Sequence, residues 1–461
     1  MDISAFFYFV KGVNPLEKEQ FILRAVGKQI PHTKIPPNLL SILKEDPFVI
    51  VRPAIVKNVC QRCGNADRSL FGKIPCIHCK KDCLYCRACI SLGRLTECTN
   101  LVTVHQEVGT TYDSTVVKNF TLSPLQLNAS NRIVQSWKEK KNLLIWAVCG
   151  AGKTEMIVEG VYEALKANQK VCIAIPRVDV VIELSKRFQQ FFPHLKISAL
   201  YGNSPDRLEP LGPLVIATTH QLFHFYHYFD WMIVDEVDAF PYSVDASLRW
   251  AVQHAKKPEA SYIYLTATPQ KDIPLKDFSI VKIPIRYHGH LLDVPRFIWC
   301  GNWRKQLTKG KLPIVVVDWL KNYEPHHPIL LFVPKVVDLP LVKKVLRWLN
   351  VETVHAADEN RKEKVEAMRT GKIKVLVTTT ILERGVTFEN VAVAILGAED
   401  DVFNKSALIQ IAGRVGRKAT HPSGPIAFFH YGKSIEMVKA RQEIIEMNQL
   451  AKKYIKEQGH E

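Results

Sequence analysis

Short apolar runs alternate with stretches of helical spacing along most of this 461-residue chain, and this alternation constrains the fold more than any other feature. Between residues 119 and 270, four such runs are rich in β-branched or aromatic residues: VCIAIP, LVIATT, WMIVDE and YIYLTATP. From about residue 311 the pattern resumes with PILLFVP, VETVHAA, KVLVTTT, VAVAILG and PIAFFHY. Because strands that alternate with helices form parallel sheets with crossover helices, the sequence predicts two α/β domains in series.

The remaining segments differ from these two domains in composition. Residues 1–57 contain several prolines, have an irregular pattern and carry no motif that indicates a role. Residues 58–100 hold eight of the eleven cysteines, and we expect them to form a small domain of their own. We place the first α/β domain at 119–288 and the second at 289–461, which ends in a predicted basic amphipathic helix.

The charge balance indicates the kind of partner. Lysine and arginine total 62 against 45 acidic residues, a net charge of +17, so a polyanion is expected, with nucleic acid as the first candidate. No run of 18 apolar residues occurs, and the first residues, MDISAFFYFV, contain an early acid and no basic region. We therefore expect a cytoplasmic protein without a signal peptide, and peripheral association with a membrane stays open.

A glycine-rich turn follows one predicted strand, in the stretch WAVCGAGKTE at residues 146–155. Small residues let the backbone curl so that several N–H groups point inward, and the next helix presents its positive end, which favours a phosphate group. Lys153 would reach the β- and γ-phosphates of a nucleotide, and the Thr154 hydroxyl would hold Mg²⁺. The loop itself would consist of Gly150, Ala151 and Gly152.

Two carboxylates end another predicted strand, in IVDEVDAFP at residues 233–241. Open α/β sheets bind ligands at the carboxyl ends of their strands, so these acids and the phosphate loop can face one site. Asp235 would hold Mg²⁺ through its water shell, and Glu236 would position or deprotonate the attacking water. Asp238 either belongs to the same network or is a turn residue.

A third motif, QIAGRVGR at residues 410–417, lies in the second predicted domain. Gln410, Arg414 and Arg417 are spaced four and three apart, which places them on one face of a predicted helix. Arginines offered across a domain cleft stabilise the charge of a transferring γ-phosphoryl group. We therefore expect Arg414 and Arg417 to complete the site from the second domain, with Gln410 beside the nucleotide.

In their order and spacing, the three motifs resemble those of superfamily 2 helicases and translocases, in which alanine is normal at the position of Ala147. The resemblance covers about residues 119–430. It implies two tandem RecA-like domains with ATP and Mg²⁺ in the cleft between them. It further implies that Gln126 of LSPLQ reads adenine, that TATP at 266–269 couples hydrolysis to domain movement, and that Glu383 to Gly385 face the cleft.

The same resemblance implies contacts with nucleic acid. The segments that carry it are IPRVDV at 175–180, ATTHQL at 217–222 and VTTTILERGVTF at 377–388. The expected contact residues are Arg177, Thr218, Thr219 and Thr379. Threonines and backbone amides at strand ends hold phosphates without reading bases, so binding is expected to be independent of sequence and sensitive to salt.

The clustered cysteines have the spacing of metal ligands. Two CxxC pairs supply four thiolates, a closed tetrahedral site that is typical of structural zinc. Without a secretion signal, such clustering favours metal over disulfides. Spacing alone permits Cys60, Cys63, Cys76 and Cys79 as the ligands, and an iron–sulfur cluster is the alternative metal.

A closer resemblance is to the ComFA family, the ATPases of the natural-competence DNA-uptake machinery of Gram-positive bacteria. The stretches that carry it are CQRCG, YCRAC followed by LGR, WAVCGAGKTEM, TTHQL, VDEVDAFPY and TTTILERGVTF. It implies that Zn²⁺ is bound by Cys60, Cys63, Cys86 and Cys89. The additional Cys76, Cys79, Cys83 and Cys98 depart from this pattern and could form a second site, with His78 as a less favoured ligand.

The family resemblance implies an ATP-dependent translocase, stimulated by single-stranded DNA, that helps to import DNA during natural transformation. It also implies ComFC and the ComEC channel as partners, and therefore a place at the inner face of the cell membrane. Basic residues of the cysteine segment such as Arg62, Arg87 and Arg94 are further candidates for DNA contact. Two alternatives stay open: a replication-restart-type DNA helicase or RNA helicase with the same core, and a non-catalytic zinc-dependent DNA-binding scaffold.

Overall fold

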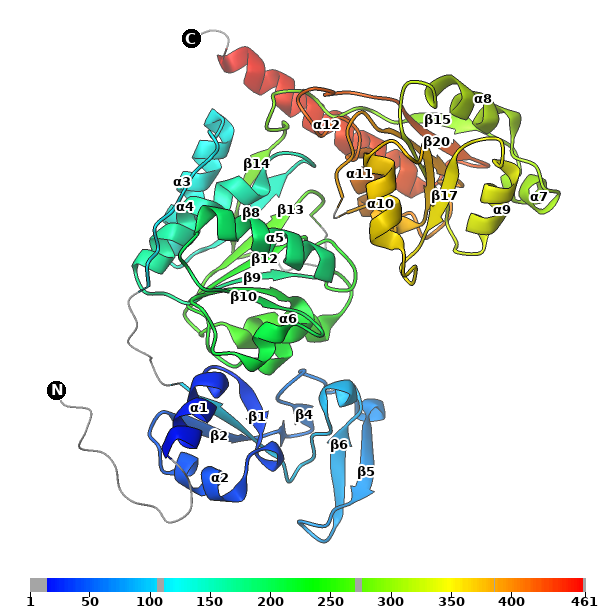
Figure 1. The fold of residues 1–461 in the computed structure, drawn as a ribbon. Helices are drawn as coiled ribbons and strands as arrows, with labels where there is room; N and C mark the ends of the chain where they lie inside the picture. The colour runs from blue at the N-terminus through cyan, green and yellow to red at the C-terminus, as the bar shows by residue number, and fades with distance from the viewer. Residues whose placement is uncertain (1–14, 106–111, 270–275, 385, 459–461) are drawn as a thin grey trace.

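The computed structural model describes residues 15–105, 112–269, 276–384 and 386–458. The chain forms an N-terminal part followed by two α/β domains, and Figure 1 shows the N-terminal part at one end of the first α/β domain and the second α/β domain beside the other end. Two expectations concern residues outside this description: the absence of a signal peptide, within residues 1–14, and the position of Gly385. Among the helices that the structure describes, none is both long and apolar enough to cross a membrane.

Seven parallel strands form the sheet of the first α/β domain, in the order β10-β11-β9-β12-β13-β8-β14. Most of these strands are buried on both faces, which explains why they were predictable as continuous apolar runs. Their bounds are β8 Asn142–Ala147, β9 Val171–Ile175, β10 Ile197–Leu200, β11 Leu214–Thr218, β12 Trp231–Asp235, β13 Tyr262–Thr266 and β14 Phe278–Ile283.

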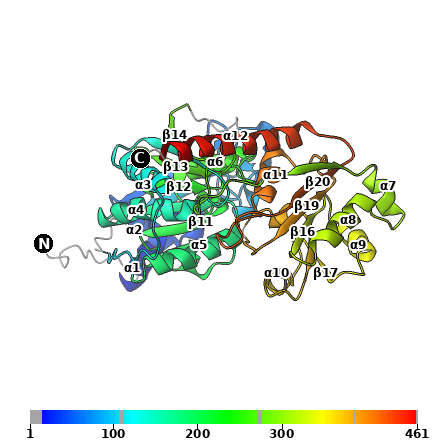
Figure 2. The same ribbon diagram turned by 90° about the horizontal axis from the view of Figure 1, so that it is seen from above.

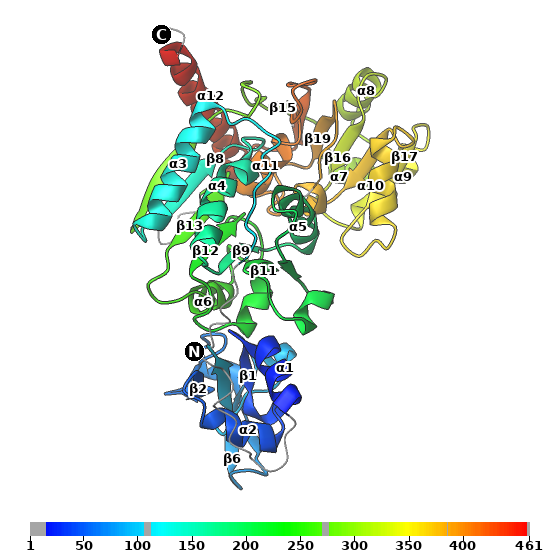
Figure 3. The ribbon, with the colours of Figure 1, turned by 60° about the vertical axis from the view of Figure 1, so that its left-hand side comes forward.

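Helices cover this sheet, and α3 lies beside α4, as Figure 3 shows. The first turn of α3 is fixed by a capping box between Ser123 and Gln126, and Pro124 stands at its first position. The helical segments of this domain are α3 Pro124–Lys138, α4 Lys153–Lys166, α5 Val178–Phe191, η5 Pro205–Leu208, η6 Thr219–His224 and α6 Ala246–Ala255.

The second α/β domain has a parallel sheet of six strands in the order β15-β20-β19-β16-β18-β17. The strands are β15 Arg296–Trp299, β16 Ile329–Phe332, β17 Val351–Val354, β18 Val375–Thr378, β19 Ala392–Leu396 and β20 Ile426–His430. The helical segments are α7 Trp303–Thr308, α8 Ile314–Tyr323, α9 Asp338–Val345, α10 Arg361–Arg369, η7 Thr380–Leu382, α11 Lys405–Ala412 and α12 Ile435–Gln458. The predicted pair of α/β domains is therefore confirmed.

The predicted C-terminal helix is α12, which also helps to join the two α/β domains. Figure 2 shows α12 running from the second domain toward β14 of the first. The Asn448 side chain accepts a hydrogen bond from the Leu292 N–H (2.9 Å) and donates one to the Leu292 carbonyl (2.8 Å). This pairing fixes the segment between the two sheets against α12.

The N-terminal part is more regular than the sequence pattern indicates. Strand β7 pairs antiparallel with both β1 and β2, and two hairpins, β3–β4 and β5–β6, carry the cysteines or lie next to them. The elements are α1 Pro15–Ala25, β1 Gln29–Pro31, η2 His32–Lys34, α2 Pro37–Lys44, β2 Val49–Pro53, β3 Ile55–Val56, β4 Val59–Cys60, η3 Arg68–Leu70, β5 Phe71–Pro75, β6 Asp82–Cys86, η4 Ile90–Leu92 and β7 Asn100–Val104.

The expectation of an irregular segment before residue 57 is therefore wrong for the described residues. Its prolines lie at the ends of helices and strands and do not interrupt them. Pro37 begins α2, where a missing N–H costs nothing, and Pro31 ends β1. The short elements are held by long-range contacts, such as Gln29, whose amide donates to the carbonyl of Phe223 in the first α/β domain (2.8 Å). Local periodicity in the sequence does not predict such contacts.

The packing around α4 generates a stability prediction. A Cβ atom at Gly160 would lie 2.8 Å from Cη2 of Trp231 and 2.9 Å from Cγ2 of Ile133, so a side chain there must displace α3 or β12. We expect Gly160→Leu to lower the free energy of unfolding of this domain by about 1–3 kcal/mol through overpacking. Urea unfolding followed by tryptophan fluorescence measures this. Gly202→Leu is the matched control, since no atom lies within 4 Å of its Cβ position, and equal midpoints for both variants would contradict the packing argument.

Candidate functional site

A cavity of about 550 Å³ lies between the two α/β domains. The first domain lines it with the phosphate-loop residues and with the acids that follow β12, and the second lines it with residues around and beyond α11. The predicted site residues on its wall are Gln126, Gly150, Ala151, Gly152, Lys153, Thr154, Asp235, Glu236, Gln410, Arg414 and Arg417. The structure therefore brings the three predicted motifs to one place.

The phosphate loop connects β8 to α4. Gly150 and Gly152 both have left-handed backbones, with φ of 81° and 75°, which favour glycine. At Gly152 a Cβ atom would also lie 2.3 Å from Nε2 of Gln126. Helix α4 starts at Lys153, so its free N–H groups and its positive end point at the loop. Such a loop can hold an anion through backbone donors.

Gln126 holds the loop from outside. Its Nε2 donates to the Ala151 carbonyl (2.8 Å), while its Oε1 accepts from the Ser123 N–H (2.8 Å). Its side chain is 4% exposed and lies on the cavity wall. Both ends of the amide thus have protein partners, and through them the start of α3 is tied to the phosphate loop.

The two predicted catalytic acids lie at the carboxyl end of β12. The Oδ1 of Asp235 accepts from the Glu236 N–H (2.8 Å), and Glu236 has a left-handed backbone with φ of 54°. Burial raises the pKa of Asp235 to about 6, against the opposing charge of Lys153. Among the described residues, Oε2 of Glu236 is buried and has no hydrogen-bond donor. A buried acceptor of this kind is suited to a water molecule or a ligand.

Asp238 belongs to a network across the two domains. Its carboxylate accepts from Thr266 (2.7 Å) and Thr268 (2.6 Å) of the TATP stretch, and from Ser406 at the start of α11 (2.7 Å). It also forms an ion pair and hydrogen bond with Arg384 of the second domain. Burial alone would raise the pKa of Asp238, but Arg384 and the hydroxyl groups outweigh it and hold this pKa well below its usual range.

Arg384 lies in the stretch Glu383 to Gly385, which was expected to face the cleft. Its side chain is 2% exposed, and its guanidinium also lies 3.7 Å from Oε2 of Glu236. The opposing charges raise the pKa of Arg384 despite its burial. The sequence marked this stretch through its motif, but the partner of Arg384 is more than a hundred residues away and could not be read from local spacing.

The third motif differs from its prediction in one respect. Helix α11 ends at Ala412, so Arg414 and Arg417 follow the helix instead of extending its face. Gly413 caps the helix and Gly416 turns the chain with φ of 66°. A Cβ atom at Gly413 would lie 2.4 Å from Cβ of Cys149, so this glycine permits the close approach of the second domain to the phosphate loop.

The cationic side chains on the cavity wall include three without a nearby carboxylate. Lys153, Arg414 and Arg417 have no carboxylate oxygen within 4.0 Å in the part of the chain that the structure describes. The Arg414 guanidinium donates to the Val386 carbonyl, and Nε of Arg417 donates to the Gly413 carbonyl (3.0 Å). Burial lowers the pKa of both arginines from its usual value, although arginine stays charged. Arg414 is buried and the other two are half-buried, so cations that lie beyond ion-pair distance of the acids in the same cavity favour a polyanionic ligand.

The four residues expected to contact nucleic acid lie outside this cavity. Thr218 ends β11 and Thr219 begins η6, and they are 4% and 0% exposed. Thr379 is half-buried and follows β18. The Arg177 guanidinium pairs with Asp179 (2.9 Å) and donates to the Ile381 carbonyl of the second domain (3.1 Å). These four residues stay predicted contacts.

The four cysteines implied by the family resemblance meet in the N-terminal part. Their sulfurs lie within 4.8 Å of one another, and all four side chains are buried: Cys60, Cys63, Cys86 and Cys89. The Sγ distances of 3.8 Å (Cys60 to Cys89) and 3.7 Å (Cys63 to Cys86) match the edge of about 3.8 Å that four thiolates form around a zinc ion with Zn–S bonds of about 2.3 Å. The donor set therefore fits zinc.

Arg62 supports this cluster instead of facing solvent. It is 3% exposed, and its Nη2 donates to Sγ (3.0 Å) and to the carbonyl (2.7 Å) of Cys89. A cation that donates to a thiolate offsets its negative charge and fixes its orientation. The remaining cysteines of the segment, Cys76, Cys79, Cys83 and Cys98, form a separate group.

One contributing residue was missed by the sequence reasoning. Arg286 lies between the two sheets and is 1% exposed, and its guanidinium donates to the carbonyls of Val415 (2.7 Å) and Pro422 (2.9 Å). It thereby holds the loop that carries Arg414 and Arg417. A single arginine in a connector with several prolines gives no local sequence signal that it holds this loop.

Family models match three parts of the chain. Residues 19–103 match the competence protein ComFA N-terminal domain, residues 119–271 match the type III restriction enzyme res subunit, and residues 312–419 match the helicase conserved C-terminal domain. The two α/β domains thus carry separate helicase matches, and the N-terminal part carries a match specific to one family.

Solved structures show the same fold. The Saccharomyces cerevisiae protein Dbp5, bound to RNA and ADP BeF3, is 15% identical with a TM-score of 0.51, and the match covers 72% of this chain and 97% of that chain. Mss116p bound to ssRNA and AMP-PNP is 17% identical with a TM-score of 0.52, and the match covers 67% and 69% of the two chains. These similarities confirm the tandem RecA-like arrangement.

Curated relatives give the family. Competence protein ComFA of Bacillus subtilis is 44% identical over 402 residues, which cover 86% of each chain. Competence protein ComFA of Streptococcus pneumoniae is 37% identical over 406 residues, which cover 84% of this chain and 93% of that protein. With identity of this level along most of both chains, and with the ComFA-specific domain before two helicase domains, the chain belongs to the ComFA family of competence proteins, which are helicase-like ATPases of superfamily 2.

Proposed function

We propose that this protein is an ATP-driven translocase on single-stranded DNA that helps to import DNA during natural transformation. The observation that carries the proposal is the cavity between the two RecA-like domains. The first domain lines it with a phosphate loop and two acids, and the second lines it with two arginines. Such a site links hydrolysis to the relative position of the domains, because each domain supplies part of it.

Within this site we assign roles to the chain's own groups. The loop amides and Lys153 bind the nucleotide phosphates, and Thr154 and Asp235 hold Mg²⁺. Glu236 orients or deprotonates the attacking water, and its Oε2, which accepts no hydrogen bond from the described residues, is available for that hydrogen bond. Arg414 and Arg417 stabilise charge on the transferring γ-phosphoryl group from the second domain. We further assign Gln410 to the nucleotide and Gln126 to the adenine, which requires the Gln126 amide to exchange its bonds with Ala151 and Ser123 for the base.

The DNA is proposed to contact the protein at Arg177, Thr218, Thr219 and Thr379, outside the nucleotide cavity. The excess of basic residues, +17 over the chain, supports a polyanionic partner. Thr218 and Thr219 are buried, so their contribution would come through the backbone at the end of β11 or after a local rearrangement. Contacts of this kind hold the phosphate backbone and carry little sequence information.

Membership of the ComFA family supports the setting of this activity. We propose that the protein works in the cytoplasm at the inner face of the cell membrane, with ComFC and the ComEC channel as partners. We also propose Zn²⁺ at Cys60, Cys63, Cys86 and Cys89, where the four thiolates would close the coordination shell and give the metal a structural role.

The first test of this function is ATP hydrolysis with no nucleic acid, single-stranded DNA, duplex DNA and RNA. We expect single-stranded DNA alone to stimulate turnover strongly, and Lys153→Ala to lower stimulated turnover by about 100-fold or more, since it removes a charge from the phosphate site. Lys166→Ala is the matched control, because Lys166 lies at the opposite end of the same helix. Stimulation by RNA or forked duplex would favour a helicase, and no turnover in the unmodified protein would favour a scaffold.

The ion pair between Asp238 and Arg384 generates a second prediction. Breaking a buried ion pair by removing one partner typically costs about 3–5 kcal/mol, and here Glu236 and Glu383 near Arg384 offset part of that cost. We expect Asp238→Asn and Arg384→Gln each to lower DNA-stimulated ATP turnover strongly while leaving it measurable, and the double variant to lose less than the two single losses combined. Kinetic measurement of all four proteins gives the coupling.

Lys439→Gln serves as the comparison for this cycle, because it removes one partner of an exposed pair with Glu436 on α12. Exposed pairs contribute little, so its turnover should equal that of the unmodified protein. Strict additivity of the Asp238 and Arg384 losses would show that the two residues act independently.

The raised pKa of Asp235 generates a third prediction. The folded-state pKa of about 6 exceeds the ordinary 3.8, so the ionised group opposes folding, and the stability of the protein falls as the pH rises between these values. A shift of two units corresponds to at most about 3 kcal/mol. We therefore expect Asp235→Asn to abolish ATP turnover yet to raise the thermal midpoint at pH 7.5, with a smaller gain at pH 4.5.

Asp230→Asn is the contrasting variant, because Asp230 pairs with Lys257 (2.6 Å) and accepts from the Lys170 N–H (2.8 Å). Its thermal midpoint should fall at pH 7.5. A lower midpoint for Asp235→Asn at pH 7.5 would refute the view that this carboxylate is held at the expense of stability.

A further inference from the structure

Four cysteines form a second cluster that the ComFA four-cysteine site leaves unused. The sulfurs lie within 4.8 Å of one another, and the residues are Cys76, Cys79, Cys83 and Cys98. Within this cluster, Sγ of Cys83 lies 3.4 Å from Sγ of Cys98, far longer than the bond of about 2.05 Å in a disulfide. His78, in the same turn, is exposed and is not a member of the group.

The turn that presents Cys76 and Cys79 has the same hydrogen bonds as the turn in the first cluster. In the first, Gly64 N–H donates to the Cys60 carbonyl (2.8 Å), and Cys60 N–H donates to the Asn65 carbonyl (2.9 Å). In the second, Lys80 N–H donates to the Cys76 carbonyl (2.9 Å), and Cys76 N–H donates to the Lys81 carbonyl (3.0 Å).

The residue after the second cysteine is left-handed in both turns, with φ of 74° at Gly64 and 54° at Lys80. A left-handed lysine is an unfavourable backbone state, so its presence needs a compensating interaction. Two CxxC turns of different sequence thus have the same backbone conformation. This conformation directs the sulfurs of both cysteines toward the same position.

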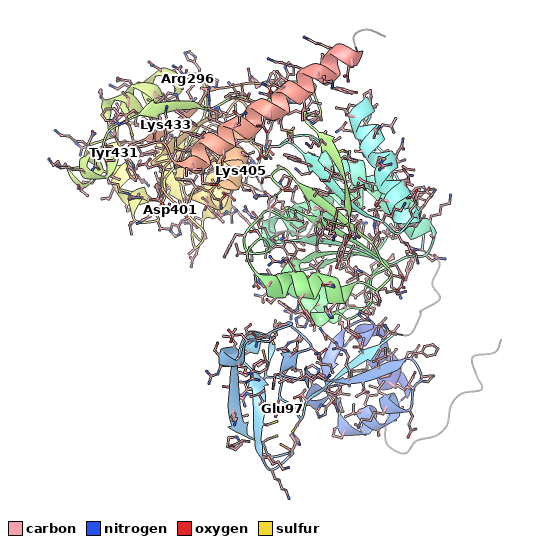
Figure 4. The ribbon with its side chains drawn as sticks, turned by 180° about the vertical axis from the view of Figure 1, so that it is seen from behind. Glu97, Arg296, Asp401, Lys405, Tyr431 and Lys433 are labelled. Carbon is pink, nitrogen blue, oxygen red and sulfur yellow. The ribbon has the colours of Figure 1, made fainter. Side chains whose placement is uncertain are left out.

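The other two cysteines are brought together by separate elements. Cys83 lies in β6, and Cys98 lies in the turn before β7. Glu97 fixes their register, because its N–H donates to the Leu84 carbonyl (3.0 Å) and its carboxylate accepts from the Leu84 N–H (3.0 Å). Figure 4 shows Glu97 in the cysteine-rich part of the chain, away from both α/β domains.

The β5–β6 hairpin explains why two clusters form. The hairpin has five paired positions; Cys86 is in the first of them, and the Cys76–Cys79 turn follows the last. At about 3.3 Å per residue this is a separation of about 13–17 Å, which is too long for a shared metal site. Cys86 and Cys89 therefore join Cys60 and Cys63, as one set of four.

We propose that Cys76, Cys79, Cys83 and Cys98 bind a second Zn²⁺, so that each chain carries two structural zinc ions. Four thiolates close the tetrahedral shell and leave no position for a substrate. Cys83 is buried and the other three are half-buried, so this site is more accessible to solvent than the first, whose four cysteines are all buried. Its zinc ties the tip of the hairpin to the turn before β7.

The test is the zinc content of the full-length protein, purified with a reductant and separated from loosely bound metal, by elemental analysis. We expect two zinc ions per chain in the unmodified protein and one in Cys76→Ser/Cys79→Ser. Because the second site is more accessible, a chelator should remove one of the two zinc ions faster, and the double variant should lack this fast phase.

Cys300→Ser is the matched control, because Cys300 is buried in the second α/β domain and belongs to neither cluster. It should keep two zinc ions. Since the altered turn is at the tip of a hairpin, the double variant should also keep the thermal midpoint of the helicase domains. One zinc ion per chain in the unmodified protein, or two in Cys76→Ser/Cys79→Ser, would overturn the proposal.

Cobalt substitution gives an independent readout, because the number of bound ions is measured on the unmodified chain. The unmodified chain should bind two Co²⁺ with the absorption of tetrahedral thiolate sites, and Cys98→Ser should lose part of the intensity from one of them. An iron–sulfur cluster would instead give iron and sulfide in the purified protein, and this result would also overturn the proposal.

Discussion

The buried pair of Asp238 and Arg384 is the interaction on which the arrangement of the two α/β domains depends. Each group would be strongly destabilising alone, because an unpaired charge in a dry environment has lost its hydration. Thr266 and Thr268 of the first domain donate to the Asp238 carboxylate, whereas Ser406 and Arg384 come from the second domain, so the full set of partners exists only while the domains are in contact. Asp238 lies three residues after Asp235, so a movement of the second domain acts directly on the strand end that carries the proposed metal ligand.

The N-terminal part acts on the opposite end of the first α/β domain. Gln29 donates to the carbonyls of Phe223 and Phe225, next to η6, and the Arg52 guanidinium lies 3.6 Å from the ring centre of Tyr226. Next to the cluster of Cys60, Cys63, Cys86 and Cys89, Gly64 lies against Trp250 of α6, where a Cβ would clash at 2.4 Å. The N-terminal part therefore contacts η6, the element that begins with Thr219, through Gln29, and α6 through Gly64, and none of its described residues lines the nucleotide cavity.

The predictable parts of this molecule are those whose signal is local. The strand runs, the phosphate loop and the acids after β12 were readable because neighbouring residues in the sequence define them. The end of α11 at Ala412 differs from the predicted helix face because Gly413 caps the helix, which the spacing of Gln410, Arg414 and Arg417 does not report. The regular N-terminal part and the role of Arg286 were missed because both depend on contacts with distant residues, which periodicity does not report.

Opposing electrostatic effects act on the contact between the domains. The Asp238–Arg384 pair attracts, while Lys153 on one side and Arg414 and Arg417 on the other are cations on the wall of one cavity, and no described carboxylate lies within ion-pair distance of them. The mutual repulsion of these cations opposes contact between the domains. A bound triphosphate would place negative charge between the cations, so that both domains would be attracted to it. Loss of the γ-phosphate would restore part of the repulsion at the wall that the second domain supplies. The distribution of charge around this cavity would thus make the contact between the domains depend on whether the bound nucleotide has a γ-phosphate.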